Sequence, residues 1–253
     1  MNNNLLIDSN NYEFNIGNKR GIYIIHGFTN STYEIKTLAQ FLAKQGYYIR
    51  ADNLPGHGTT PKDCNRFKFQ DWIKHVEQGF AEMSVHCEQV FVIGISMGSV
   101  LAMYLSSLFP IDGAIYASIA LKFQQKIGMH FLTPIFHNFI SYRSKYHSYP
   151  SNLQKKLNFL GYKVWPLSAL NEVRKLTKVV RPKLVKITCP ALLIHSKADA
   201  LTLEENVDFA YKSISSKNKE IFRLENAGHN IFIDNPDQQI IFQKITSFLN
   251  KLN

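Results

Sequence analysis

Short apolar runs alternate with amphipathic stretches along most of this 253-residue chain. Apolar runs of about five residues are typical of buried parallel strands, whereas apolar residues recurring every three to four positions are typical of helices. The alternation predicts an α/β fold, with a mostly parallel, doubly wound sheet and helices on both of its faces. The expected strands span residues 21–25, 47–51, 89–93, 113–116, 191–194 and 220–224.

Three of the amphipathic stretches have a clear helical face. The first carries the apolar residues of 38–42, and the second runs from Val100 to Leu108 and should end before Pro110. The last carries the apolar face of 241–252. Because these stretches lie between or after the predicted strands, they fit the helices of a doubly wound sheet.

One interval, residues 121–170, breaks the alternation. It shows no clear strand, it is dense in aromatic and aliphatic side chains, and it is too long for an ordinary loop. We therefore predict a small helical cap at 121–170, inserted into a core that is made of residues 1–120 and 171–253.

The segment Gly-Ile-Ser-Met-Gly at 94–98 lies between an apolar run and an amphipathic stretch. That context predicts a strand, a tight turn and a helix, in which strained backbone angles hold the serine hydroxyl out of the sheet. Gly94 and Gly98 are needed because a Cβ at either position would crowd the neighbouring strand or helix. Ser96 is therefore the candidate nucleophile, and the Met97 amide at the helix start can stabilise an oxyanion.

A serine nucleophile needs a base, and the base needs an orienting carboxylate. His229 follows the expected strand 220–224 in a short loop, at the strand end where open α/β sheets build their sites. Asp199 lies in the loop after the preceding strand, and the order Ser96, Asp199, His229 is expected of serine hydrolases with such a sheet. Asp208 and Glu225 are weaker alternatives for the acid, whereas Asp234 and Asp237 can belong to the start of the last helix, where carboxylates cap amides.

A second oxyanion donor is expected in the segment His-Gly-Phe-Thr at 26–29, directly after the first strand. Gly27 would let the chain turn sharply, so that the Phe28 amide faces the nucleophile. We interpret His26 as a structural hydrogen-bonding residue. His57 follows another strand within a Pro-Gly-His-Gly segment, and we interpret it as part of a tight surface turn.

Composition narrows the class of protein. No stretch approaches the roughly 18 apolar residues that span a bilayer, and the first residues lack a signal-peptide layout, so a cytoplasmic location is expected. The three cysteines, Cys64, Cys87 and Cys189, have neither disulfide nor zinc-ligand spacing. We therefore expect free thiols, no metal and no cofactor.

The net charge of +10 is concentrated in the basic stretch 143–186, where eleven Lys and Arg side chains face the single acid Glu172. Such a stretch can bind an anionic lipid surface or another anion, although a solvated face is the commoner explanation. Nucleic acid is not an expected partner, because no recognisable binding module accompanies the basic residues.

Five motifs together resemble those of the small bacterial carboxylesterases and monoacylglycerol lipases of the α/β-hydrolase superfamily. They are His26-Gly27-Phe28-Thr29, Leu54-Pro55-Gly56-His57-Gly58, Gly94-Ile95-Ser96-Met97-Gly98, His195-Ser196-Lys197-Ala198-Asp199 and Ala227-Gly228-His229. The resemblance implies an α/β-hydrolase fold and a triad of Ser96, Asp199 and His229. It also implies oxyanion donors at Phe28 and Met97, and a compact cap over an apolar acyl pocket. The cap side chains expected to line that pocket are Phe123, Phe131, Ile135, Phe136 and Phe139.

The sequence thus predicts a serine hydrolase that cleaves carboxylic esters with short to medium acyl chains, such as a monoacylglycerol, through an acyl-enzyme on Ser96. The basic stretch leaves a second possibility open, an acyl thioesterase or lysophospholipase acting on an anionic acyl substrate. A third possibility, from another class, is a hydrolase fold that binds a ligand without turnover. The sequence makes no prediction of the oligomeric state.

Overall fold

The central sheet of this protein has seven strands in the order β1-β3-β2-β4-β5-β8-β9. The computed structural model describes residues 7–122, 139–146, 160–233 and 235–252. Neighbouring strands are parallel except at one edge, where β1 runs antiparallel to β3. The strands are β1 (Tyr12–Phe14), β2 (Arg20–Ile25), β3 (Tyr48–Ala51), β4 (Gln89–Ile95), β5 (Gly113–Ala117), β8 (Ala191–Ser196) and β9 (Lys219–Leu224). All six strands expected from the sequence are confirmed, and within this central sheet the short edge strand β1 was not predicted.

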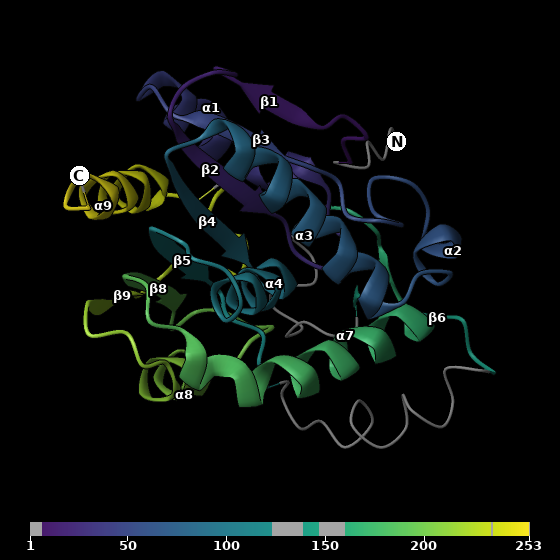
Figure 1. The fold of residues 1–253 in the computed structure, drawn as a ribbon. Helices are drawn as coiled ribbons and strands as arrows, with labels where there is room; N and C mark the ends of the chain where they lie inside the picture. Colours follow the sequence, from purple (N-terminus) through teal and green to yellow (C-terminus); the bar gives the residue numbers. More distant parts are fainter. Residues whose placement is uncertain (1–6, 123–138, 147–159, 234, 253) are drawn as a thin grey trace.

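Helices cover both faces of the sheet, as the alternating pattern predicted (Figure 1). On one face lie α1 (Lys36–Lys44) and α9 (Gln238–Asn250). On the other face lie α3 (Phe69–His86), α4 (Met97–Ser106), α7 (Leu167–Val180) and α8 (Glu205–Ser213). The short elements are α2 (Pro61–Cys64) and two 3₁₀ helices, η1 (Thr32–Ile35) and η3 (Arg181–Lys186).

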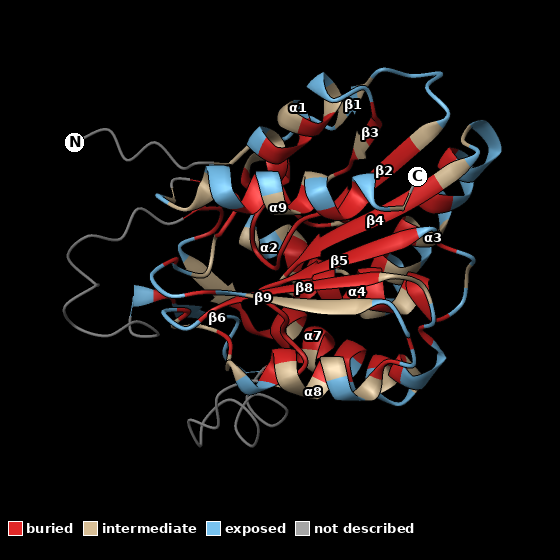
Figure 2. Cartoon of the chain, turned by 90° about the vertical axis from the view of Figure 1, so that its left-hand side faces the viewer, coloured by how far each residue is buried: buried red, intermediate tan, exposed pale blue. Residues whose placement is uncertain are grey.

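The apolar core is divided into two clusters, one on each face of the sheet. Along β2, Ile22 and Ile24 pack with the α1 and α9 side, whereas Tyr23 and Ile25 pack with α3 and α4. Because successive side chains of a strand point to opposite faces, both faces of the strand must be apolar. Figure 2 shows the strands buried between the two helical layers, which explains the continuous apolar runs in the sequence.

The cap region contains a small sheet that the sequence did not reveal. Strand β6 (Tyr142–Ser144) pairs antiparallel with β7 (Val164–Pro166). The prediction of an interval without strands is wrong here, because three-residue strands are too short to show an alternating pattern. Helix α7 begins at Leu167 and packs against α3 and α4 of the core. Most of the predicted cap, 123–138 and 147–159, lies outside the described residues, so its helical character stays a prediction.

Three further observations concern thiols, metals and membranes. The cysteines are free thiols, and Cys64 is buried whereas Cys87 and Cys189 are partly exposed. Within the ranges that the structure describes, no three His, Cys, Asp or Glu side chains gather as metal ligands would. None of the helices in those ranges combines the length and the apolar character that a bilayer span requires.

Candidate active site

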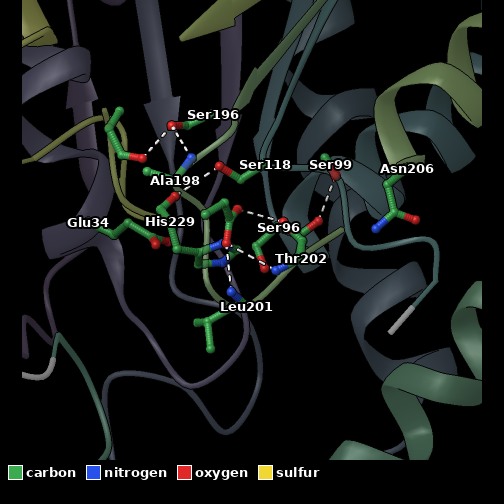
Figure 3. Close-up of polar contacts among 12 residues, drawn as sticks. Glu34, Ser96, Ser99, Ser118, Ser196, Ala198, Leu201, Thr202, Asn206 and His229 are labelled. Atoms are coloured by element: carbon green, nitrogen blue, oxygen red, sulfur yellow. Dashed lines mark hydrogen bonds and ion pairs between the residues drawn. The ribbon is translucent and has the colours of Figure 1, made fainter. Parts of the chain in front are cut away.

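The candidate site lies at the carboxyl edge of the sheet, where loops from five parallel strands meet. Ser96 directly follows β4, Asp199 follows β8 and His229 follows β9. Phe28 lies in the turn after β2, and Ser118 directly follows β5. Carboxyl ends of parallel strands share one edge, so these loops converge although they are far apart in the chain. The close-up view shows Ser96, His229 and Ser118 gathered there (Figure 3).

Ser96 forms a strained elbow between β4 and α4. Its φ of 57° and ψ of −119° are unfavourable for a residue with a Cβ. A Cβ on Gly94 would lie 2.2 Å from the Gly98 carbonyl oxygen, and one on Gly98 would lie 2.1 Å from that of Ile25. The structure therefore confirms the expected reason for both glycines. Since α4 begins at Met97, the Met97 N–H is one of the groups at a helix start that have no partner within the helix.

Asp199 and His229 form a buried hydrogen-bonded pair. Nδ1 of His229 lies 2.8 Å from Oδ2 of Asp199. The carboxylate also accepts from Thr202 Oγ1 at 2.6 Å and from the Leu201 and Thr202 amides at 2.8 and 3.0 Å. Burial alone would raise the pKa of Asp199, but the neighbouring His229 and the bonds from Thr202 hold it well below its usual range. Asp199 is therefore ionised, and its partner must donate.

The orientation of His229 follows from this pair. Because the Asp199 carboxylate is an acceptor only, Nδ1 of His229 carries a proton and Nε2 is left as the acceptor. The His229 carbonyl accepts from Ser118 Oγ at 2.8 Å, and the carbonyl of the adjacent Ala117 accepts from the Ser96 N–H at 2.9 Å. These bonds tie the histidine loop and the serine elbow to the same strand end (Figure 3).

Burial and charge act in opposite directions on His229. Burial lowers its pKa, but the charge and hydrogen bond of Asp199 raise it, and the net pKa is above its ordinary value. Glu34 raises this pKa further, and Lys145 lowers it. The neighbours of His229 therefore make it a stronger base than a free imidazole.

The peptide group that joins Gly27 to Phe28 carries the Phe28 N–H, and the carbonyl oxygen of the same group, from Gly27, anchors it. The Gly27 oxygen accepts from His26 Nδ1 at 2.8 Å and from the Asn30 amide at 3.3 Å. Nε2 of His26 accepts from the Leu54 amide at 3.0 Å, so the proton is on Nδ1. Since a peptide group is planar, fixing the Gly27 oxygen also fixes the direction of the Phe28 N–H. His26 has the structural role that the sequence suggested.

Gly27 leaves room for its neighbours rather than making the turn. A Cβ on Gly27 would lie 3.1 Å from both Glu34 Oε2 and Ser96 Cβ. The positive φ of the turn lies instead at Thr29, with a value of 64°. The expectation that Gly27 makes the sharp turn is therefore wrong, because the close packing of three segments is not visible in a local motif. The amide of Tyr162, from the cap region, donates to the Thr29 carbonyl at 2.9 Å and holds the turn from outside.

Glu34 is a buried acid of the site that sequence reasoning missed. Its carboxylate accepts from the Gly27 amide at 2.6 Å and from Asn30 Nδ2. Burial raises the pKa of Glu34, and the bond from Gly27 opposes that shift. The spacing of Ser31 and Glu34 matches a helix-capping pattern, but such a pattern carries no sign of a catalytic site. Only the fold shows that Glu34 lies behind the turn at 26–29, the oxyanion turn, whose Phe28 N–H is the predicted oxyanion donor.

Replacing Glu34 with Gln is expected to lower kcat by about 10-fold, because one of the two acceptors that hold the turn becomes a donor. It should also shift the acidic limb of the kcat/KM profile to lower pH. The negative charge of Glu34 raises the pKa of His229, so its loss lowers that pKa and leaves the base neutral at lower pH. A pH profile with a p-nitrophenyl ester measures both effects. Glu220→Gln, on β9, is the control, and an unchanged profile for Glu34→Gln would contradict the role.

Other predicted residues are placed differently from the expectation. His57 is only 3% exposed and packs against Phe28 and Trp72, so the predicted surface turn is wrong. Its neighbours are aromatic side chains that come together only in the folded chain.

Phe139, a candidate for the acyl pocket, is 82% exposed. The other pocket candidates, Phe123, Phe131, Ile135 and Phe136, lie outside the described residues, so the pocket stays a prediction.

Comparison with known proteins identifies the family. A family model described as serine aminopeptidase, S33, matches residues 17–236. The chain belongs to this α/β-hydrolase family. A thermostable monoacylglycerol lipase from Bacillus sp. (strain H-257) is 31% identical over 248 residues, which covers 91% of this chain and 90% of the relative.

Two further α/β-hydrolase matches extend over nearly the whole chain. A carboxylesterase from Bacillus subtilis (strain 168) is 23% identical and covers 94% of this chain and 95% of the relative. A solved structure from work on LipS and LipT, two metagenome-derived lipolytic enzymes, has a TM-score of 0.86 at 26% identity. It covers 98% of this chain and 99% of that chain. The predicted α/β-hydrolase fold and its carboxylesterase and monoacylglycerol lipase family are confirmed.

Proposed function

We propose that this α/β-hydrolase cleaves carboxylic esters through an acyl-enzyme on Ser96. The observation that carries the proposal is the buried, ionised Asp199 bonded at 2.8 Å to His229, beside a serine held at a φ of 57°. A serine nucleophile, a histidine base and an orienting acid are the groups that this reaction requires, which supports the proposal. The names of the relatives, a monoacylglycerol lipase and a carboxylesterase, support an ester as the substrate.

The proposed reaction has two halves. Ser96 Oγ attacks the ester carbonyl while His229 Nε2 takes its proton, and Asp199 stabilises the imidazolium that forms. The N–H groups of Phe28 and Met97 stabilise the oxyanion of the tetrahedral intermediate. His229 then gives the proton to the leaving alcohol. In the second half a water molecule, activated by the same histidine, hydrolyses the acyl-enzyme and restores Ser96.

The acyl group is proposed to be apolar and of short to medium length, as in a monoacylglycerol. The aromatic and aliphatic content of 121–170 and the named relatives support this choice. A receptor without turnover is less well supported, because the bonded acid and base have no role in such a protein. The predicted cytoplasmic location and the predicted anionic lipid surface stay predictions.

A fluorophosphonate probe tests the proposal directly. The folded protein should be labelled once, at Ser96 by peptide mapping, and the heat-unfolded protein should not be labelled, because reactivity depends on the assembled base and oxyanion donors. In parallel, p-nitrophenyl esters and monoacylglycerols of increasing chain length map the acyl pocket. A folded protein that neither reacts with the probe nor hydrolyses any of these esters would favour the receptor function instead.

A further inference from the structure

Lys145 is a buried lysine beside the oxyanion turn. It belongs to the basic stretch 143–186, yet it is only 4% exposed, whereas Lys178 of the same stretch is exposed. Its Nζ donates to Oγ1 of Thr29 and lies 4.7 Å from the centre of the Trp165 ring. The interpretation of the basic stretch as a solvated face is therefore wrong for this residue.

Two neighbouring contacts place Lys145 close to the proposed chemistry. Thr29 directly follows Phe28, and Thr29 Oγ1 donates in turn to the Phe28 carbonyl at 2.5 Å. The Trp165 ring stacks on the Phe28 ring, with centroids 6.0 Å apart. The charge of Lys145 is also felt at His229, whose pKa it lowers. A substrate held at the oxyanion donors therefore lies near this amine.

Lys145 lacks a counter-ion in the part of the chain that the structure describes. None of the ion pairs found there, at N···O distances up to 4.0 Å, involves Lys145. The charge of Glu34 raises the pKa of Lys145, but it acts from beyond the distance of an ion pair. The Glu34 carboxylate already accepts hydrogen bonds from the Gly27 amide and from Asn30.

The remaining cap segments cannot supply a carboxylate side chain either. The sequence contains no Asp or Glu between Asp112 and Glu172, a range that includes 123–138 and 147–159. A buried charge without a partner is costly, so proteins pair it or let it lose its proton. Burial lowers the pKa of Lys145 to about 7, so the amine and ammonium forms coexist near neutral pH. An arriving anion favours the ammonium form.

The surrounding histidines do not compete for such an anion. Burial lowers the pKa of His57 to about 4, and it holds that of His26 well below its ordinary value. Both imidazoles are therefore neutral near pH 7, whereas the Lys145 amine, which bonds Thr29 of this turn, can carry a positive charge at that pH.

We propose that Lys145 is a specificity-determining residue that binds an anionic oxygen group, a carboxylate or a phosphate, on the ester substrate. This inference rests on the proposed ester hydrolysis and narrows its substrate class. A structural link to Thr29 needs a single N–H, which a neutral side chain could donate without burying a charge. An ammonium offers two further N–H groups, and these fit an acceptor that arrives with the substrate.

Two matched substrate pairs test the proposal and distinguish where the anion sits. On the acyl side, mono-p-nitrophenyl glutarate is compared with p-nitrophenyl pentanoate, which replaces the carboxylate by a methyl group. On the alcohol side, 1-decanoylglycerol 3-phosphate is compared with 1-decanoylglycerol. Each substrate is measured with the wild-type protein, with Lys145→Met and Lys145→Arg, and with Lys178→Met as the control for loss of an exposed charge.

In at least one pair, Lys145→Met should lower kcat/KM for the anionic member by about 10- to 100-fold. This loss corresponds to the free energy of one hydrogen bond to a charged group. The neutral member should change by less than about threefold, and Lys145→Arg should retain part of the preference. Lys178→Met should change neither member.

Two results would overturn the inference. Equal losses for both members of each pair would make Lys145 a structural link to Thr29, and unchanged kcat/KM values for all four substrates would exclude anion recognition. In either case, turnover of the neutral esters by the wild-type protein would leave the proposed ester hydrolysis intact. That reaction fails separately, if the wild-type protein hydrolyses no ester and resists the fluorophosphonate probe.

Discussion

Replacing Ser96 with Ala should reduce kcat for p-nitrophenyl butyrate by about 10⁴-fold or more, because it removes the hydroxyl that is proposed to form the acyl-enzyme. The proposed oxyanion donors, the N–H groups of Phe28 and Met97, stay in place, so a small residual rate above that of water is expected. Labelling by the fluorophosphonate probe should disappear completely.

The fold of this variant should be unaffected. Alanine has the same Cβ as serine, so the strain of the elbow is unchanged, and the Ser96 N–H bond to the Ala117 carbonyl is retained. Melting temperature and circular dichroism should therefore match the wild-type protein. Ser84→Ala is the matched control, since Ser84 only bonds the Phe80 carbonyl within its own helix. Turnover by Ser96→Ala at more than about a tenth of the wild-type rate would rule out Ser96 as the nucleophile.

Replacing Asp199 with Asn should lower kcat by about 10³- to 10⁴-fold while the fold is retained. In the wild-type protein the carboxylate accepts from His229 Nδ1 and from Thr202 Oγ1. An amide at this position can present its NH₂ group to Nδ1, which favours the tautomer with the proton on Nε2. That tautomer cannot take the proton of Ser96. Steady-state kinetics with p-nitrophenyl butyrate measure the loss.

The pH profile gives a second readout for Asp199→Asn. Asp199 raises the pKa of His229 through its charge and its hydrogen bond, so its loss should lower that pKa. The residual activity should then persist to lower pH than in the wild-type protein. The control is Asp208→Asn, which removes the alternative acid, a half-exposed carboxylate on α8 that pairs with Arg223. A larger loss with Asp208→Asn than with Asp199→Asn would reverse the assignment.

The positions of the candidate triad could be predicted because each residue lies just after a strand. Ser96 is marked by flanking glycines between an apolar run and a helix, and Asp199 and His229 follow two successive strands. Parallel strands bring their carboxyl ends together regardless of sequence distance. Recognising the strands was therefore enough to predict that these residues meet.

The failures of sequence reasoning involve groups whose role depends on contacts between distant segments. Glu34 supports a turn that begins at Gly27, and the three-residue strands β6 and β7 pair across a long interval of the chain. Lys145 is one charge among eleven in a basic stretch, and nothing in its local sequence distinguishes it from exposed Lys178.

The sequence by itself determined six strands of the central sheet, the serine elbow, and the candidate acid and base that follow β8 and β9. These depend on local patterns, the period of apolar residues and the glycines of one tight turn. The tertiary structure decided that Gly27 makes room for Glu34 and Ser96, and that Lys145 is buried beside Thr29. Burial and hydrogen bonding arise only when distant segments pack together, and they shift the pKa values of Glu34 and Lys145.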